Sequence, residues 1–404
     1  MGKFTGPWSP FFKGLPWSFN PFAKCSGVFM AEIIMTLTNR FDPDVRVFKE
    51  ARYLVQKGNQ VTVLCWDRNL EYPDQEDQWI DGVHIKRFYY YSQYGTGMKQ
   101  LKSFLRFRSA CRRYLREKTF DAIHGHDLDG MIIGAHLLRP GVRLTFDMHE
   151  IYEINAGSSF YRKIVRLLVH HYQNKADAII YVNPLQKDLA RERNFPKFHY
   201  LPNFPSLEDY QGAYPRIRRD KDPLKVGYIG SVRQEEELKN LILSAENLKD
   251  VEIFIHGAGT SYEPLRTFAE NRPGVHVTGV YHYSDSVRLY NGIDLLYVLY
   301  PKSVLQYAQT YPIKFFEGIL TLTPMVVGRG TVLEKIVKEK GIGFAVDGED
   351  REEISALLVQ LRDRPEILNQ CVENLKKIQY EYSWDQVVSV LSQIYPPKGP
   401  FHEE

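Results

Sequence analysis

The segment 310–318 combines a helix start with two charged side chains whose spacing suits a nucleotide. Proline at the first helical position presets φ and needs no amide partner, so we expect a helix to begin at Pro312 with its positive end free for a phosphate. Lys314 and Glu317 are three residues apart and share one helix face. A carboxylate can accept hydrogen bonds from both ribose hydroxyls, and an ammonium can pair with a diphosphate. An ordinary surface ion pair has the same spacing, so other features must decide between the two interpretations.

Two loops of small residues come before this segment, each directly after an apolar run that we predict to be a strand. The first, GYIGSVR at 227–233, contains Gly230, which permits close backbone approach, and Arg233, which could bind phosphate oxygens through two N–H groups. The second, HGAG at 256–259, places Gly257 after the next strand. Tight turns use glycine for geometry alone, but the order of these features predicts a phosphate site in the second half.

Titratable side chains also follow two predicted strands of the first half. His126 and Asp127 follow one strand, and Asp147, His149 and Glu150 follow the next. A histidine or carboxylate there could orient an acceptor hydroxyl or take its proton, a role that we assign to His126 and Glu150. The other three are further acceptor-side candidates. The alternative is that these groups only satisfy nearby loop amides.

No metal site is predicted. Asp127 and Asp129 imitate a D-x-D metal motif, but we interpret Asp129 as the cap of a helix over 129–138. The four cysteines are scattered without paired spacing, which favours a reducing compartment over a disulfide or zinc framework.

Short β-rich runs alternate with amphipathic helical stretches, a pattern typical of α/β units with parallel sheets. Strands are predicted at 33–37, 61–65, 83–88, 122–124, 142–146, 178–182 and 198–201, and again at 224–229, 251–255, 275–278, 295–299 and 324–327. A helix is predicted over 45–57, with Val45, Phe48, Ala51, Tyr53 and Val55 on its apolar face and Gly58 at its end.

The two strand series predict two domains, as the length of 404 residues suggests. From the N-terminus we expect an aromatic and proline-rich extension at 1–29, a Rossmann-like domain at 30–201, a linker at 202–223, a second Rossmann-like domain at 224–380, and a closing helix and tail at 381–404.

Composition sets further bounds. Hydrophobic residues make up 44% of the sequence and charged residues 25%, which is close to the average of globular proteins. The net charge of +3 is too small to indicate a nucleic-acid partner. The sequence contains no apolar run near the ~20 residues needed to cross a bilayer. We therefore expect a cytoplasmic protein. The basic stretches 104–118 and 161–171 could rest on the inner face of an anionic membrane, or could be ordinary packing helices.

The ordered motifs of the second half, with 44–54, 120–127 and 146–150 of the first, resemble the GT-B glycosyltransferases of family 4. The resemblance covers nearly all of 31–394 and implies two Rossmann-like domains with parallel sheets that face each other across a cleft. By this resemblance the domain at 30–201 binds the acceptor and the domain at 224–380 binds the nucleotide-sugar donor. It also implies that Glu317 holds the donor ribose, that Lys314 and Arg233 bind the donor phosphates, and that the amides around Thr310 and Tyr311 bind sugar or phosphate. The sequence departs from the family's E-x7-E pattern, because Gln309 or Thr310 stands where the first acid is usual and no carboxylate lies within 295–316.

The implied reaction transfers a hexose-type sugar from a UDP- or GDP-linked donor to a hydroxyl of a glycan, a lipid-linked intermediate or a small metabolite. It would retain the anomeric configuration and use no cofactor or metal. Two alternatives share this architecture, a non-hydrolysing nucleotide-sugar epimerase and a non-catalytic nucleotide-sugar-binding subunit. A nicotinamide dehydrogenase is disfavoured because no G-x-G-x-x-G follows the first strand of either half.

Overall fold

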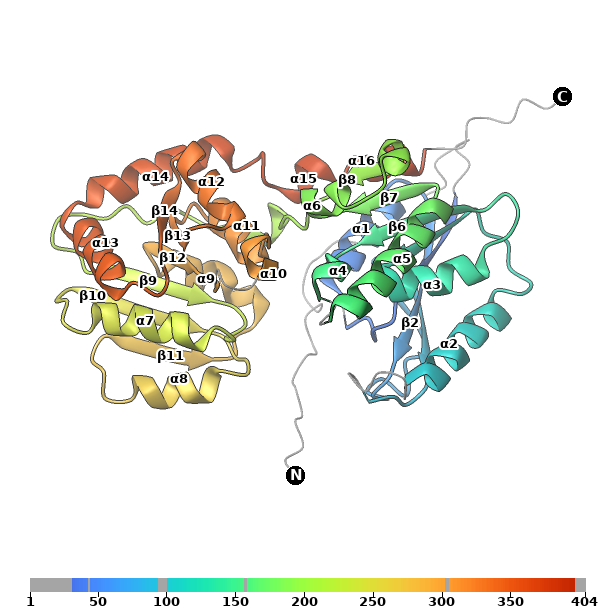
Figure 1. Cartoon of the computed structure of the whole chain (residues 1–404), viewed down its shortest axis with the longest axis horizontal. Coiled ribbons are helices and arrows are strands. Elements are labelled where there is room, and N and C mark those ends of the chain that lie inside the picture. Colours follow the sequence, from blue (N-terminus) through green and yellow to red (C-terminus); the bar gives the residue numbers. More distant parts are fainter. Residues whose placement is uncertain (1–30, 43, 94–99, 156–157, 302–304, 397–404) are drawn as a thin grey trace. The chain divides into compact units, whose positions relative to one another are not determined.

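The computed structural model describes residues 31–42, 44–93, 100–155, 158–301 and 305–396, which form two compact units (Figure 1). Unit 1 comprises the chain up to Leu201 together with the part from Val388 onward, and unit 2 comprises Pro202–Val387. The extension predicted at 1–29 lies outside the described residues.

Unit 1 is built on an eight-stranded sheet in the order β3-β4-β2-β1-β5-β6-β7-β8. Its strands are β1 (Glu32–Thr36), β2 (Gln60–Asp67), β3 (Asp77–Ile80), β4 (Val83–Tyr89), β5 (Ala122–His126), β6 (Arg143–Met148), β7 (Ala178–Tyr181) and β8 (Phe198–Tyr200). All pairs are parallel except β3 with β4. The predicted strands are confirmed. The short strand β3 was missed because it is half-exposed, with Trp79 70% exposed.

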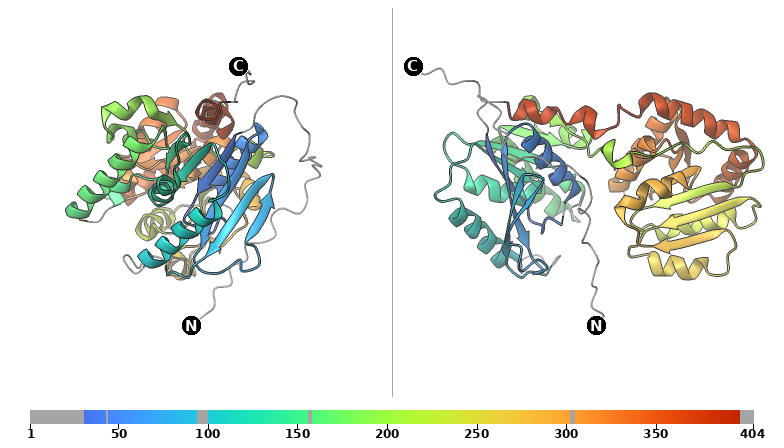
Figure 2. Two further views of the ribbon diagram at one scale, coloured as in Figure 1. Left: turned by 90° about the vertical axis from the view of Figure 1, so that its right-hand side faces the viewer. Right: turned by 180° about the vertical axis from the view of Figure 1, so that it is seen from behind.

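Helices cover both faces of this sheet (Figures 1 and 2). They are α1 (Val45–Gln56), α2 (Leu101–Tyr114), α3 (Asp127–Leu137), α4 (Tyr152–Asn155), α5 (Ser159–Lys175), α6 (Pro184–Asp188) and α16 (Val390–Ile394), with a 3₁₀ turn at Glu192–Lys197. Helices α2, α3 and α5 bury Phe107, Met131 and Val169 in one core that includes Trp66 of β2. Helix α16, which follows unit 2 in the chain, packs against α1, where Ser392 Oγ lies 2.9 Å from Tyr53 OH.

Helix α1 begins and ends as predicted but buries a different face. Asp44 caps its start by accepting from Val47 N–H, and Gly58 follows its end with φ 89°. Val45, expected on the apolar face, is 47% exposed, whereas the charged Arg46 and Glu50 are buried. The buried side of α1 is therefore partly ionic.

Unit 2 contains a six-stranded parallel sheet in the order β11-β10-β9-β12-β13-β14. Its strands are β9 (Leu224–Ile229), β10 (Val251–His256), β11 (Val275–Gly279), β12 (Leu295–Val298), β13 (Met325–Gly328) and β14 (Gly343–Val346), of which only β14 was not predicted. The chain runs outward from β9 to β11 and then returns to the other side of β9 with β12. The strand order thus reverses between β9 and β12, the place where such sheets usually bind ligands.

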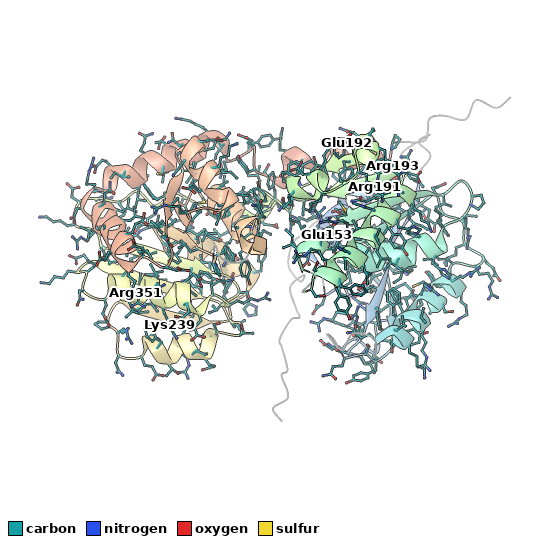
Figure 3. The ribbon with its side chains drawn as sticks, viewed as in Figure 1. Glu153, Arg191, Glu192, Arg193, Lys239 and Arg351 are labelled. Carbon is teal, nitrogen blue, oxygen red and sulfur yellow. The ribbon has the colours of Figure 1, made fainter. Side chains whose placement is uncertain are left out.

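The helices of unit 2 pack on both sides of its sheet. They are α7 (Glu235–Ala245), α8 (Tyr262–Ala269), α9 (Ser286–Asn291), α10 (Leu305–Ala308), α11 (Ile313–Leu320), α12 (Val332–Lys340), α13 (Arg351–Asp363), α14 (Pro365–Ile378) and α15 (Trp384–Val387). Helices α7, α8 and α13 share one core, and α9, α11 and α12 share the other. Arg351 at the start of α13 lies beside α7, where its Nε donates to Asn240 Oδ1 at 2.8 Å (Figure 3).

The segment 202–223, predicted as a linker, packs on unit 2. It contains a 3₁₀ turn at Glu208–Tyr210, and both Phe204 and Tyr210 are buried in the core that includes α9 and α11. This segment therefore contributes side chains to unit 2.

Candidate functional site

The predicted phosphate-binding helix exists as α11, beside the point where the strand order of unit 2 reverses. Pro312 occupies its N-cap position, with φ −71° and ψ 142°, one residue earlier in the helix than predicted. Lys314 and Glu317 are both buried. The interpretation of this pair as an ordinary surface ion pair is therefore wrong.

Glu317 is held by two tyrosines from distant parts of unit 2. Tyr210 OH donates to one carboxylate oxygen and Tyr290 OH to the other, each at 2.7 Å. Burial raises the pKa of Glu317, while the two tyrosine donors and Lys314 act in the opposite direction. Each oxygen keeps a second acceptor position, so the carboxylate can still accept from two ligand hydroxyls.

Lys314 lies in an aromatic setting next to the first glycine loop. Its Nζ is 3.6 Å from the ring centroid of Tyr228 and would be 3.2 Å from a Cβ added to Gly230. Burial lowers the pKa of Lys314 to about 7, although Glu317 favours its charged form. A phosphate would restore the full positive charge of this side chain.

The two glycine loops touch each other at the carboxyl ends of β9 and β10. Gly230 and Gly257 have φ 126° and 133°, and a Cβ on Gly257 would lie 1.9 Å from the carbonyl oxygen of Gly230. Gly230 N–H donates to His256 O at 2.9 Å. Glycine is therefore required at position 257 by the close backbone approach and favoured at position 230 by its positive φ, and the two loops lie together beside Lys314.

The other predicted donor residues have looser surroundings. Arg233 is exposed, and its Nε donates to Ser231 Oγ at 3.0 Å. Thr310 and Tyr311 lie half-buried directly before α11, where Tyr311 stacks on Phe316 with ring centroids 6.4 Å apart. The structure thus brings Gly230, Gly257 and Lys314 together and places Glu317 on the same helix as Lys314.

Unit 1 contains a buried charge cluster at the carboxyl ends of β5 and β6. Arg46 binds Asp147 through two hydrogen bonds of 2.8 and 3.2 Å, and its guanidinium lies 3.1 Å from Glu50. Arg46 holds the pKa of Asp147 well below its usual range against burial, whereas burial and the negative charge of Asp147 raise the pKa of Glu50 to about 8. We infer that Asp147 carries the negative charge of this pair of carboxyls.

Two of the predicted residues, His126 and His149, contact Asp147, and His149 links Asp127 to this group. His126 Nδ1 donates to Asp147 at 3.0 Å and His149 Nε2 donates at 2.7 Å, while His149 Nδ1 lies 3.3 Å from Asp127. Despite burial, the two carboxylates raise the pKa of His149 well above its usual value, so both of its ring nitrogens carry protons. Burial lowers the pKa of His126, which leaves that ring neutral.

Two predictions for these loops need correction or remain open. Helix α3 begins at Asp127, with His126 in the N-cap position, so the prediction that Asp129 caps the helix is wrong. Asp127 accepts from Tyr152 OH at 2.9 Å in addition to its contact with His149. Glu150 is exposed, and its carbonyl accepts from Gln186 Nε2 at 2.9 Å, so its carboxylate stays a candidate that faces solvent.

One group of buried side chains has the composition of a metal site. Ligand atoms of Glu50, His124, His126 and Asp147 lie within 4.8 Å of one another. The Arg46 guanidinium already pairs with both carboxylates and supplies the positive charge that a metal ion would bring. We therefore interpret this group as an internal ion network.

Several functional candidates carried no sequence signal of their own. Tyr210 and Tyr290 lie 107 and 27 residues from Glu317. The i,i+4 spacing of Arg46 and Glu50 could have been noticed, but charged pairs of this kind are usually solvated. His124 alternates with His126 along β5, which is a weak signal of an internal polar row.

Comparison with known proteins gives matches over both halves of the chain. The family described as Glycosyltransferase Family 4 matches residues 44–209, and Glycosyl transferases group 1 matches 214–378. The alpha-galactosylglucosyldiacylglycerol synthase of Streptococcus pneumoniae is 26% identical over 254 residues. This match covers 58% of the present chain and 65%, just under two thirds, of that relative.

Solved structures share the fold at low identity. Sucrose-phosphate synthase of Thermosynechococcus elongatus has a TM-score of 0.69 at 13% identity, over 91% of this chain and 98% of the other. HepE of Anabaena in complex with UDP-glucose has a TM-score of 0.66 at 13% identity, over 90% and 99%.

Proposed function

We propose that this chain, which belongs to the family 4-like glycosyltransferases of the GT-B fold, transfers a hexose-type sugar from a nucleotide-sugar donor to a hydroxyl acceptor. The bond from the sugar C1 to the donor diphosphate breaks, a bond from C1 to the acceptor oxygen forms, and the acceptor proton leaves with a base or with the diphosphate. The anomeric configuration is retained, as the resemblance to family 4 implies.

The observation that carries this proposal is the buried pair of Lys314 and Glu317 beside the touching glycine loops. The Glu317 carboxylate accepts from the two ribose hydroxyls, and the Lys314 ammonium pairs with the diphosphate of a UDP- or GDP-linked donor. Gly230 and Gly257 allow that diphosphate to approach the backbone closely. Exposed Arg233 can turn toward the phosphates when they bind.

Unit 1 supplies the acceptor side in this proposal. His126 is fixed by Asp147, and its Nε2 has no hydrogen-bond partner among the described residues. This neutral nitrogen can accept a hydrogen bond from an acceptor hydroxyl. The charged His149, held between Asp127 and Asp147, keeps those carboxylates from repelling each other.

We further propose a lipid-linked acceptor at an anionic membrane surface, which the printed name of the Streptococcus relative supports. No helix in the described part of the chain is long and apolar enough to span a bilayer. Helix α5 instead combines an exposed apolar set with exposed cations, as membrane-surface helices do. The apolar set is Phe160, Tyr161, Ile164, Leu167 and Leu168, and the cations are Arg162, Lys163 and Arg166.

The nucleotide part is tested with Glu317→Gln, measured by calorimetric titration with UDP and GDP. Loss of a charged acceptor for the ribose should weaken binding by about 1.5–3 kcal/mol, which is about tenfold or more. Glu339→Gln is the matched control, because Glu339 is exposed on α12 and its ion pair among the described residues is with Lys335, at 3.8 Å. Equal nucleotide affinity in both variants would exclude Glu317 from the site.

The transfer part is tested by incubating the enzyme with nucleotide-sugars, with and without vesicles that carry glycolipid acceptors. We expect a glycosylated lipid and free nucleoside diphosphate. An epimer of the donor formed without acceptor would show an epimerase, and binding without any turnover would show a binding subunit. Activity should persist in EDTA, because the proposed chemistry uses no metal.

A further inference from the structure

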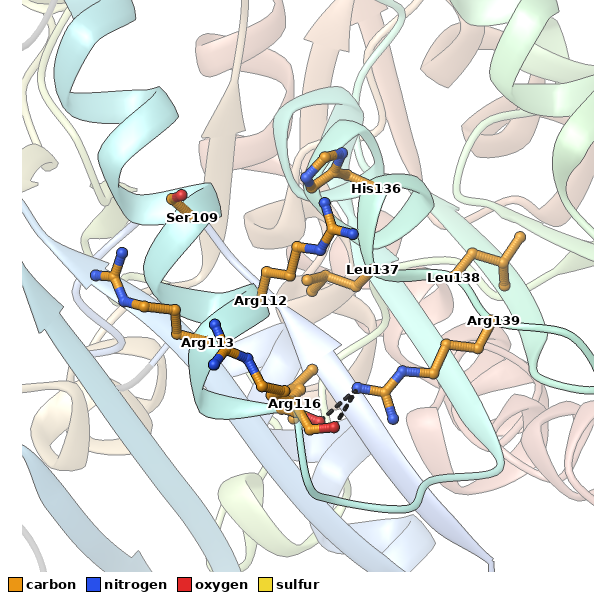
Figure 4. Close-up of a pocket in the computed structure, with 9 residues that line it drawn as sticks. Ser109, Arg112, Arg113, Arg116, His136, Leu137, Leu138 and Arg139 are labelled. Carbon is orange, nitrogen blue, oxygen red and sulfur yellow. Dashed lines mark hydrogen bonds between the residues drawn. The ribbon is translucent and has the colours of Figure 1, made fainter.

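A cationic cavity lies on unit 1, apart from the charge cluster at Asp147, where the ends of α2 and α3 meet (Figure 4). Its volume is about 640 Å³. The lining residues are Ser109, Arg112, Arg113, Leu115, Arg116, His136, Leu137, Leu138 and Arg139. Four of these nine are arginines and none is acidic, so the cavity has an unbalanced positive charge.

Arg139 builds the wall of this cavity. Its guanidinium donates to the carbonyl oxygens of Leu115, Arg116 and Lys118 after the end of α2, and it lies 4.7 Å from the ring centroid of Phe120. The bonds to the Leu115 and Arg116 carbonyls are the two dashed lines in Figure 4. These bonds satisfy carbonyls that a helix end leaves free. Arg139 therefore has a structural role, and its position is fixed.

The other three arginines have no comparable structural role among the described residues. Arg112, Arg113 and Arg116 are exposed, and none has an ion pair or side-chain hydrogen bond among the described residues. A cation in the last turn of α2 favours the helix dipole, which accounts for Arg112 and Arg113 in part. The helix dipole does not account for Arg116, which follows the end of α2 and lines the same cavity.

The positive charge around the cavity affects the protonation of His136. Its ring lies at the cavity, with the Arg112 side chain directed toward it (Figure 4). Partial burial lowers the pKa of His136, and the charges of Arg108 and Arg112 lower it further. The imidazole is therefore neutral near pH ~7 and can donate one hydrogen bond to an anion without competing for its charge.

We propose that this cavity binds a phosphate group, carried either by a membrane lipid headgroup or by a soluble phosphorylated molecule. Guanidinium groups bind phosphate oxygens in pairs, and three of them around one opening match a tetrahedral dianion. The hydroxyl of Ser109 and the His136 ring add neutral donors. The cavity exceeds one phosphate, which leaves room for the group that carries it.

A lipid source fits the surrounding surface. Helix α3 packs between α2 and α5 on one face of the sheet (Figures 1 and 2). On α2, Leu101 and Leu105 are 44% and 40% exposed, and α5 carries the exposed apolar set described above. The helix that ends at the cavity and the helix α5 thus both carry exposed apolar side chains, as a lipid surface would require.

The test compares two double variants of α2 and the segment after it, each lacking two positive charges. Arg113→Gln/Arg116→Gln changes the cavity, whereas Lys102→Gln/Arg106→Gln removes exposed cations of α2 that do not line it. Binding is measured to inorganic phosphate and, separately, to phosphatidylcholine vesicles with about one fifth phosphatidic acid. Both variants keep Lys314, so phosphate bound at the donor helix contributes equally.

We expect the cavity variant to bind about tenfold more weakly than the control variant to at least one probe. Loss for vesicles alone assigns a lipid headgroup, and loss for inorganic phosphate assigns a soluble ligand. Equal weakening in both variants would show unspecific charge attraction and overturn the proposal, as would wild-type binding by the cavity variant. Sugar transfer is not part of the readout, so this result is independent of the proposed reaction.

Discussion

Two tyrosine hydroxyls donate to Glu317, and removing either one should impair nucleotide binding. The change leaves in place every residue that we propose to contact the nucleotide. In Tyr290→Phe or Tyr210→Phe, one carboxylate oxygen of the buried Glu317 loses a donor at 2.7 Å. Neither ring is lost from the core, since phenylalanine keeps the same apolar contacts. The carboxylate stays buried, and its charged form becomes harder to maintain.

The magnitude follows from the kind of bond that is removed. A hydrogen bond to a charged group contributes about 1.5–3 kcal/mol, and one factor of ten corresponds to about 1.4 kcal/mol. Each variant should therefore bind UDP or GDP about tenfold more weakly where the pH is low enough to protonate the Glu317 carboxyl of the variant. Because the pKa of Glu317 rises further in the variant, the loss should be greatest at low pH and should diminish as pH increases.

Calorimetric titration with nucleotide across pH gives the measurement, and donor KM should rise while kcat changes less. The matched control is Tyr297→Phe, another buried tyrosine of unit 2, whose hydroxyl donates to the Glu237 carbonyl at 3.3 Å. If all three variants share one affinity and one pH profile, the tyrosines only pack the core and the reasoning about Glu317 fails.

Three further outcomes are expected. Nucleotide affinity of the wild type should fall as pH rises through about 7, where Lys314 loses its proton, and calorimetry on Lys314→Gln should show weaker binding without that dependence. Asp147→Asn should lower the free energy of unfolding by about 3–5 kcal/mol in urea, because it removes the charged partner of buried Arg46 and leaves only Glu50, whose pKa is raised to about 8, to balance that charge. The contribution of Asp147, whose pKa is depressed, is present above pH ~4 and lost as pH falls, so the acid limb of stability should flatten in this variant. Gly257→Ala should abolish measurable nucleotide binding, because its Cβ would meet the Gly230 carbonyl at 1.9 Å, whereas Gly212→Ala, at φ 87° with no atom within 4 Å, should bind normally.

Local patterns predicted most of the scaffold. The strands of both sheets follow apolar runs, and the glycine loops and the start of α11 are encoded within a few residues each. Strands β3 and β14 were missed because neither carries a buried apolar run. The buried face of α1 was predicted wrongly, because the helix buries Arg46 and Glu50 and charged residues usually indicate the face of a helix that is exposed to solvent.

The supports of the site could not be predicted because they come from distant segments. Tyr210 lies in a polar and proline-rich stretch with the composition of a linker, and nothing near it in sequence indicates a partner 107 residues away. The same holds for the charge cluster of unit 1, where Arg46 reaches Asp147 across 101 residues. Sequence identifies the groups that meet a ligand more readily than the groups that hold them.

The return of the chain to unit 1 after unit 2 bears on how the protein is made. Tyr395 OH donates to Thr145 Oγ1 at 2.9 Å and lies 3.0 Å from His124 Nδ1, in the interior of unit 1. During synthesis domains generally fold in order from the N-terminus. In this chain Tyr395 is synthesised after the whole of unit 2. Thr145 and His124 therefore lack this hydrogen-bond partner until unit 2 has left the ribosome. A nascent or truncated chain without Tyr395 would carry unpaired polar atoms next to the Asp147 cluster, a defect that quality control could detect before any sugar is bound.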